Sequence, residues 1–178
     1  MLNTKKKNEI KDKWCVIVPT FNNGKTLRTV LTNILDITPN VILINDGSND
    51  NTSHIIAEFK NSIDIITHKI NMGKGKSLRD GFEYAIKKGF DYAITIDSDG
   101  QHYPEDISLL LDMIIKHPES LIVGARNMQQ NNIPKKSSFG NKFSNFWFWV
   151  ETGITLSDKQ TGFRLYPLNK MKNISFVT

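Results

Sequence analysis

Two carboxylates stand one residue apart, directly after an apolar run of the chain. The run covers residues 92–96, and the residues that follow it are Asp97-Ser98-Asp99-Gly100-Gln101. A run of this kind is typical of a buried strand, which would place a pair of oxygen ligands at the edge of a sheet, and such ligands suit a hard divalent cation. Asp and Gly are also favoured in turns. The motif alone therefore leaves a metal site and a plain turn both open.

Apolar runs alternate with amphipathic segments along most of the chain. Strands are predicted at 14–18, 41–44, 63–67, 92–96 and 121–123. The intervening segments with apolar residues at helical spacing are 27–35, 55–59, 78–86 and 107–115. Solid apolar strands that alternate with helices indicate a mostly parallel sheet covered on both faces, so the expected fold class is α/β.

Polar clusters follow four of the predicted strands. They are residues 19–23, 45–48, 97–99 and 124–126. Ligands of a parallel sheet bind outside the carboxyl ends of its strands, so all four clusters should face one edge. Two carboxylates about 4 Å from a diphosphate would repel it by several kcal/mol per pair, whereas a divalent cation between them reverses the sign. Asp97 and Asp99 with a metal therefore predict a nucleotide-diphosphate site, to which Gln101 adds a third oxygen.

Length, charge and cysteine content limit the possible classes of protein. The 178 residues suit one domain, and the net charge of +5 with a pI near 9.2 suits an anionic partner: a phosphorylated substrate, a membrane surface or nucleic acid. The single Cys15 allows no disulfide within the chain and fits a reducing compartment. No apolar stretch is long enough for a membrane span or a signal peptide. We expect a polar tail over 1–13 and a cytoplasmic protein, peripheral at the inner face of the membrane.

Five ordered motifs resemble those of family-two glycosyltransferases. They are Val16-Ile17-Val18-Pro19-Thr20-Phe21-Asn22, Asn45-Asp46-Gly47-Ser48-x-Asp50-x-Thr52, Asn71-x-Gly73-Lys74-Gly75, Asp97-Ser98-Asp99-Gly100-Gln101-His102 and Gly124-Ala125-Arg126. The Asp-x-Asp-x-Gln-His form is similar to the branch that makes dolichyl-phosphate or polyprenyl-phosphate mannose and glucose. The resemblance implies a Rossmann-like GT-A fold of three α/β/α layers, a nucleotide-diphosphate sugar donor such as GDP-mannose or UDP-glucose, and Mg²⁺ or Mn²⁺.

The resemblance also implies which residues bind the donor. The residues that match the nucleotide-binding segments of the family are Pro19, Phe21, Asn22, Asp46, Asn71, Gly73, Lys74, Asp97 and Ser98. Among these, Asp46 matches the acid that hydrogen-bonds the base. Lys74 is either a phosphate partner or a solvated lysine at the start of a helix. The implied metal ligands are Asp97, Asp99 and Gln101.

The later part of the chain bears on the acceptor. A polyprenyl phosphate is already an anion, so it requires cations rather than a strong base, and the implied phosphate ligands are Arg126, Lys142 and Arg164. A saccharide hydroxyl would require a carboxylate base, for which Asp158 is the candidate, although Asp158 equally suits a structural pair with Arg164. The expected catalytic residues are Asp97, Asp99, Arg126 and Asp158, and the expected outcome is inversion at the anomeric carbon.

An aromatic-rich stretch over 139–150 follows Lys135 and Lys136. Aromatic and cationic residues together favour the membrane interface, so we interpret this stretch as an interfacial helix, the alternative being a core helix packed on the sheet. Nucleic-acid binding is not expected, because the aromatic residues cluster instead of alternating with a basic groove.

Three functions remain open at this point. The favoured one is a metal-dependent transferase that makes a polyprenyl-phosphate sugar. The others are a family-two transferase with a saccharide acceptor in cell-surface polysaccharide synthesis, and an inactive module that binds a nucleotide sugar. The chain stops soon after 164–167, where the family usually continues. We therefore expect 14–178 to be a single catalytic domain that is truncated at its C-terminus.

Overall fold

The structure is a computed structural model that describes residue 10 and residues 12–124 and 162–171. The elements of this part of the chain are β1 (Trp14–Thr20), α2 (Leu27–Leu35), β2 (Val41–Asn45), α3 (Thr52–Glu58), β3 (Asp64–Thr67), α4 (Lys74–Lys88), β4 (Tyr92–Thr95), the 3₁₀ helix η1 (Pro104–Asp106), α5 (Ile107–Lys116), β5 (Ile122–Val123), β6 (Arg164–Pro167) and α7 (Leu168–Met171). Each strand and helix predicted from the apolar pattern is present, with ends that differ by a few residues.

The six strands form one mixed sheet in the order β3-β2-β1-β4-β6-β5. β1 pairs in parallel with β2 and β4, and β2 pairs in parallel with β3. β6 runs antiparallel to both β4 and β5. The predicted α/β class with a mostly parallel sheet is therefore confirmed. β6 was not predicted as a strand, because its four residues include only two large apolar side chains and end in a proline.

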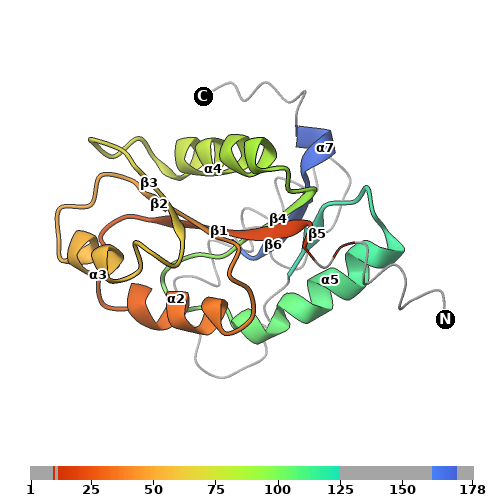
Figure 1. The fold of residues 1–178 in the computed structure, drawn as a ribbon, viewed down its shortest axis with the longest axis horizontal. Helices are drawn as coiled ribbons and strands as arrows, with labels where there is room; N and C mark the ends of the chain where they lie inside the picture. Colours follow the sequence, from red (N-terminus) through yellow and green to blue (C-terminus); the bar gives the residue numbers. More distant parts are fainter. Residues whose placement is uncertain (1–9, 11, 125–161, 172–178) are drawn as a thin grey trace, which may run out of the picture.

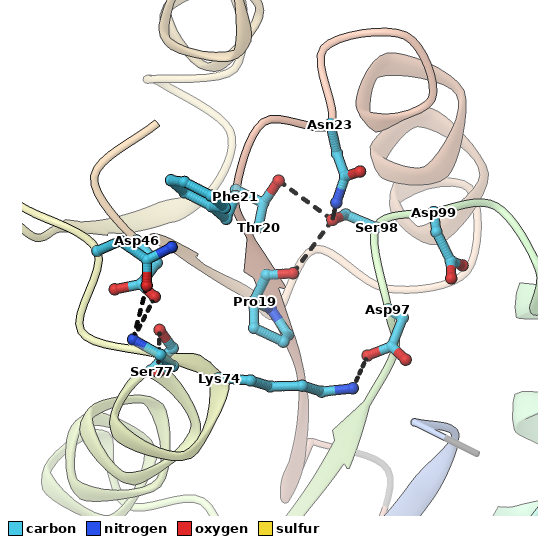
Figure 2. Close-up of a pocket in the computed structure, with 12 residues that line it drawn as sticks. Pro19, Thr20, Phe21, Asn23, Asp46, Lys74, Ser77, Asp97, Ser98 and Asp99 are labelled. Carbon is cyan, nitrogen blue, oxygen red and sulfur yellow. Dashed lines mark hydrogen bonds and ion pairs between the residues drawn. The ribbon is translucent and has the colours of Figure 1, made fainter. Parts of the chain in front are cut away.

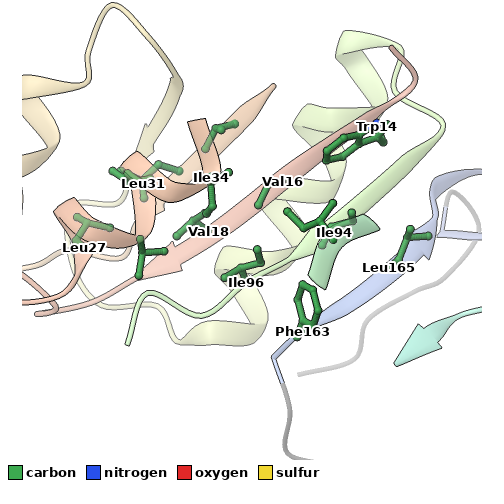
Figure 3. Close-up of a cluster of buried hydrophobic side chains, with 14 of the residues drawn as sticks. Trp14, Val16, Val18, Leu27, Leu31, Ile34, Ile94, Ile96, Phe163 and Leu165 are labelled. Carbon is green, nitrogen blue, oxygen red and sulfur yellow. The ribbon is translucent and has the colours of Figure 1, made fainter. Parts of the chain in front are cut away.

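Helices cover both faces of the sheet, which gives the three expected layers (Figure 1). α2, α3 and α5 lie on one face, and α4 and α7 lie on the other. Successive side chains of β1 point to opposite faces. Val16 and Val18 pack toward α2 (Figure 3), whereas Cys15 and Ile17 pack toward α4. Because both faces are buried, all seven residues of β1 are buried.

A close approach fixes α4 against the sheet. A Cβ atom at Gly81 would lie 2.7 Å from Cγ2 of Ile17 and 3.0 Å from Cδ1 of Ile44. Only glycine allows this contact between helix and strands without displacing core side chains. This contact fixes the distance of α4, the helix that begins with Lys74, from β1 and β2.

Several predictions concern residues that the structure does not describe. These are most of the polar tail over 1–13, the segment with Arg126, Lys142 and Asp158, and the aromatic-rich stretch over 139–150. Within the described ranges, none of the helices combines the length and the apolar character that crossing a membrane requires.

Candidate active site

A cavity of about 330 Å³ lies at the carboxyl ends of β1, β2 and β4 (Figure 2). It is lined by Pro19, Thr20, Phe21, Asn23, Asp46, Asn71, Gly73, Lys74, Ser77, Asp97, Ser98 and Asp99. This is the edge at which a parallel sheet binds its ligands. The structure thus brings together Asp99 and every predicted nucleotide-binding residue except Asn22.

The centre of the cavity is held by Ser98, which is buried at the end of β4. Its hydroxyl oxygen accepts a 2.7 Å hydrogen bond from Nδ2 of Asn23 and lies 3.1 Å from both the carbonyl oxygen of Pro19 and Oγ1 of Thr20. Oγ1 of Thr26 donates to the carbonyl oxygen of Ser98 at 2.6 Å. These bonds join the loop after β1 to the loop after β4, so the two loops form one rigid floor.

Asp46 defines the β2 side of the cavity and is 3% exposed. Its carboxylate accepts 2.8 Å hydrogen bonds from the backbone amides of Met72 and Gly73, and it lies 2.6 Å from Nδ1 of His68. Burial acts to raise the pKa of this carboxyl, but the bonds from His68, Met72 and Gly73 together outweigh burial and lower the pKa below its usual value of 3.8. Asp46 is therefore a buried anion that holds the loop before α4.

Asp97 and Asp99 define the β4 side of the cavity. Oδ1 of Asp97 lies 2.5 Å from Nζ of Lys74, and Oδ2 lies 3.9 Å from Nε2 of His102. Asp99 is exposed, and its Oδ1 accepts a 2.9 Å bond from the backbone amide of Gln101. The turn that the sequence left open is thus present, and the same turn leaves both carboxylates at the cavity.

The donor atoms on this side suit a hard cation that a substrate helps to hold. In the described part of the chain, no group of three or more His, Cys, Asp or Glu could hold a metal ion by itself. Mg²⁺ is commonly bound by one or two carboxylates together with substrate phosphates, which is the arrangement that Asp97 and Asp99 allow. The ammonium group of Lys74 already occupies a cation position beside Asp97. Gln101, the third predicted ligand, does not line the cavity.

The start of β6 passes directly beside Asp97. A Cβ atom at Gly162 would lie 2.2 Å from Oδ2 of Asp97, so any larger residue there would displace the carboxylate or the start of β6. The carbonyl oxygen of Gly162 accepts a 2.6 Å bond from Oγ1 of Thr95, and the ring of Phe163 stacks on His102 with centroids 5.7 Å apart. Arg164 follows on β6, in register with Thr95, and does not line the cavity.

Asn22 was predicted to lie against the nucleoside, but it does not line the cavity. Its φ of 53° is in the left-handed region, which Asn tolerates better than most residues. Its backbone amide donates to Oγ of Ser48 at 3.0 Å, and its Oδ1 accepts from the amide of Asn49 at 2.9 Å. Asn22 therefore joins the loop after β1 to the loop after β2.

Three cavity residues were not predicted: Thr20, Asn23 and Ser77. Thr20 and Asn23 lie within the polar cluster 19–23, so the cluster pointed to their neighbourhood. Their shared partner Ser98 is more than 70 residues away in the chain, and no local pattern indicates such a contact. Arg126, Lys142 and Asp158 lie outside the described residues, so their roles stay predictions.

Comparison with known proteins gives consistent matches over most of the chain. The model of the family described as glycosyl transferase family 2 matches residues 15–174. The UDP-N-acetylglucosamine–dolichyl-phosphate N-acetylglucosaminyltransferase of Methanococcus voltae is 30% identical over 179 residues, which cover 90% of this chain and 71% of that protein. The undecaprenyl-phosphate mannosyltransferase of Micrococcus luteus is 25% identical over 166 residues, which cover 89% of this chain and 68% of the relative.

Among solved structures, glucosyl-3-phosphoglycerate synthase from Mycobacterium tuberculosis, in complex with Mn²⁺, UDP and phosphoglyceric acid, has the same architecture. The TM-score is 0.70 at 16% sequence identity, and the match covers 94% of this chain but only 60% of that one. At this identity the likeness shows the fold alone. It confirms the expected three-layer GT-A architecture.

Proposed function

The chain belongs to glycosyl transferase family 2, and from this premise we propose that it transfers a sugar from a nucleotide-diphosphate sugar to a polyprenyl phosphate, with a divalent metal and with inversion at the anomeric carbon. The observation that supports the donor part of the proposal is the division of the cavity. A buried carboxylate, Asp46, stands on the β2 side, and Asp97 and Asp99 stand on the β4 side, with residues of β1 between them (Figure 2).

The β2 side suits the nucleoside. Phe21 is 40% exposed at the cavity, so its ring offers an aromatic surface to a base. Asp46 keeps its negative charge near neutral pH, because its pKa is lowered, and a carboxylate can accept a hydrogen bond from a base N–H. Asn71 and Gly73 line the same side from the loop before α4. We expect the diphosphate to extend from here toward Lys74.

The β4 side suits the diphosphate and its metal. When bound, Mg²⁺ or Mn²⁺ supplies Lewis-acid stabilisation of the charge that develops on the leaving diphosphate. Asp97 and Asp99 bring the negative charge that attracts such an ion. The Nζ of Lys74 lies at Asp97, and its side chain is 52% exposed, so it is free to turn toward a phosphate oxygen when a donor enters. The site then exchanges one ion pair for another at little cost.

Two arguments support a polyprenyl phosphate as the acceptor: the names of the relatives and the negative charge of a phosphate monoester. Both relatives named above carry a lipid phosphate in their names. A phosphate monoester is an anion near neutral pH, so its oxygen can attack without a strong base and needs cations to hold it. Arg126, Lys142 and Arg164 are proposed for this task, and the stretch over 139–150 is proposed to lie at the membrane surface. The protein would then act at the cytoplasmic face of the membrane.

A transfer assay tests this proposal. The full chain is incubated with Mn²⁺ or Mg²⁺, undecaprenyl or dolichyl phosphate in detergent, and labelled UDP-N-acetylglucosamine, UDP-glucose or GDP-mannose. Metal-dependent label in the organic phase, absent with Asp99→Asn, is the expected result. Transfer only to saccharides, or nucleotide binding with no transfer to any acceptor, would contradict the proposal. The first outcome would indicate the polysaccharide-type enzyme, and the second would indicate the inactive binding module.

A further inference from the structure

His68, directly after β3, lies between two carboxylates. Its Nδ1 is 2.6 Å from Oδ1 of Asp46, and its Nε2 is 2.9 Å from Oδ2 of Asp80 on α4. The side chain of His68 is 11% exposed, and those of Asp46 and Asp80 are 5% and 18% exposed. His68 does not line the cavity. It lies behind Asp46, where it joins the end of β2 to α4.

Each ring nitrogen of His68 faces a carboxylate oxygen. A neutral imidazole carries one N–H, so it could donate to only one carboxylate and would direct a lone pair at the other. Only the doubly protonated ring donates to both Asp46 and Asp80. The charged groups near it include these two carboxylates and Lys76, which forms an ion pair with Asp80. Largely buried carboxylates of this kind require cationic partners.

Asp46 connects this cluster to the wall of the cavity. The same carboxylate that meets His68 accepts the backbone amides of Met72 and Gly73. Beside it, Gly47 packs so closely that a Cβ atom there would lie 2.4 Å from the carbonyl carbon of Ile70. The segment fixed in this way supplies Asn71, Gly73 and Lys74 to the cavity. The orientation of Asp46 therefore determines the position of one whole wall.

We propose that His68 is a positioning residue for the donor site. In its doubly protonated form it holds Asp46 against Asp80, and through Asp46 it holds the 71–74 wall in the shape that binds the nucleotide. This role rests on the proposed function, because it assumes that the cavity binds the donor.

Asn and Gln substitutions separate the two bonds of His68. The amide nitrogen of Asn lies near the position of Nδ1, so His68→Asn keeps a donor toward Asp46, whereas the longer Gln places its donor near Nε2, toward Asp80. We expect His68→Gln to weaken the binding of UDP or GDP with Mn²⁺ by about tenfold or more, the size expected for one lost bond to a charged group, and His68→Asn to weaken it less. His54→Gln, at an exposed position of α3, is the matched control and should bind as the wild type does.

Two further readouts need no nucleotide. NMR of the ¹⁵N-labelled imidazole should show both nitrogens of His68 protonated at neutral pH. Hydrogen exchange at the amides of Met72 and Gly73 should become faster in His68→Gln than in the wild type.

The outcomes distinguish this proposal from the proposed function. A neutral His68 at pH 7, or unchanged protection of the Met72 and Gly73 amides in His68→Gln with normal nucleotide binding, would overturn the role of His68 alone. A wild-type chain that binds no nucleotide would overturn the proposed function and the positioning role with it, even if the imidazole is doubly protonated.

Discussion

Asp46 and Asp97 lie on opposite sides of the same cavity and are held in opposite ways. Asp46 is 3% exposed and takes bonds from two backbone amides and from His68. The side chain of Asp97 is 21% exposed, and the nearest cation is the ammonium group of Lys74, whose side chain is 52% exposed. Asp46 therefore stabilises the wall of the cavity, whereas Asp97 has a partner, Lys74, that a ligand can replace.

The difference shows how one edge of the sheet can hold one carboxylate in a fixed position and leave another carboxylate able to change its partner. Removing a buried carboxylate that accepts bonds from backbone amides leaves those amides without acceptors, which is costly. An exposed ion pair contributes little to stability, so a metal and a diphosphate can replace it cheaply. We therefore expect substitutions on the two sides to separate the effects on stability from the effects on binding.

Asp97→Asn should have the largest effect on binding and almost none on stability. Loss of the charge removes an attraction for the metal, and we expect metal-dependent nucleotide binding to fall by about 100-fold or more, while the free energy of unfolding changes by less than about 1 kcal/mol. Calorimetric titration and urea unfolding measure the two quantities. A variant that unfolds far more easily would show that Asp97 belongs to the framework as well.

Asp46→Asn should lower stability as well as binding. The amide cannot accept from Met72 and Gly73 while pairing with a charged His68, so we expect a loss of about 1–3 kcal/mol in the free energy of unfolding. Because the pKa of Asp46 is lowered by folding, its contribution is fully present above 3.8 and is lost as the pH falls through the lower, folded-state pKa. Urea unfolding between pH 2 and pH 7 should show this acid-sensitive step in the wild type and not in the variant.

Gly162→Ala tests whether the start of β6 must leave room for Asp97. The added Cβ would overlap the carboxylate, so Asp97 must turn or β6 must shift, at a cost of about 1–3 kcal/mol. We expect weaker metal-dependent nucleotide binding with an intact fold by circular dichroism. Gly89→Ser is a useful comparison: Gly89, unlike Gly162, has open space around it, but its φ is +87°, so the cost of the substitution is backbone strain far from the cavity. Equal nucleotide affinity in wild type and Gly162→Ala would contradict the close approach.

Lys74→Met should give the smallest effect, with opposite signs for the two ligands. Without the ammonium group Asp97 is free for a metal, so Mn²⁺ alone should bind a few-fold more tightly, whereas UDP should bind about tenfold more weakly because it loses a phosphate partner. Electron paramagnetic resonance of free Mn²⁺ and calorimetry with UDP measure these changes. Lys25→Met, on the exposed surface at the start of α2, serves as the charge-matched control. A fall in both affinities would indicate that Lys74 only shapes the loop.

The sequence was sufficient for those parts of the fold that depend on local pattern. Solid apolar runs identified the strands that end at the cavity, and the polar residues after them identified most of its lining. β6 was not predicted, because its residues lack such a run. Its place in the sheet depends on pairing with β4, some 70 residues earlier in the chain. Asn22 does not line the cavity, and it forms hydrogen bonds with the neighbouring loop, so its contact with the nucleoside stays a prediction.

The role of His68 could not be read from the sequence for the same reason. Its partners Asp46 and Asp80 are 22 and 12 residues away, and only the packing of α4 on the sheet brings them to one imidazole. Nothing near His68 in the chain marks it as different from the exposed His54. Contacts of this kind, which depend on tertiary packing, can be identified only from the three-dimensional structure.

Calorimetric titration of UDP and GDP into the full chain, with and without Mn²⁺, is the decisive measurement of the donor site. We expect that one of the nucleotides binds, that Mn²⁺ strengthens its binding, and that Asp97→Asn removes the effect of the metal while leaving the melting temperature nearly unchanged. Absence of binding by either nucleotide, or binding that is equally strong without metal and in Asp97→Asn, would contradict the proposed donor site.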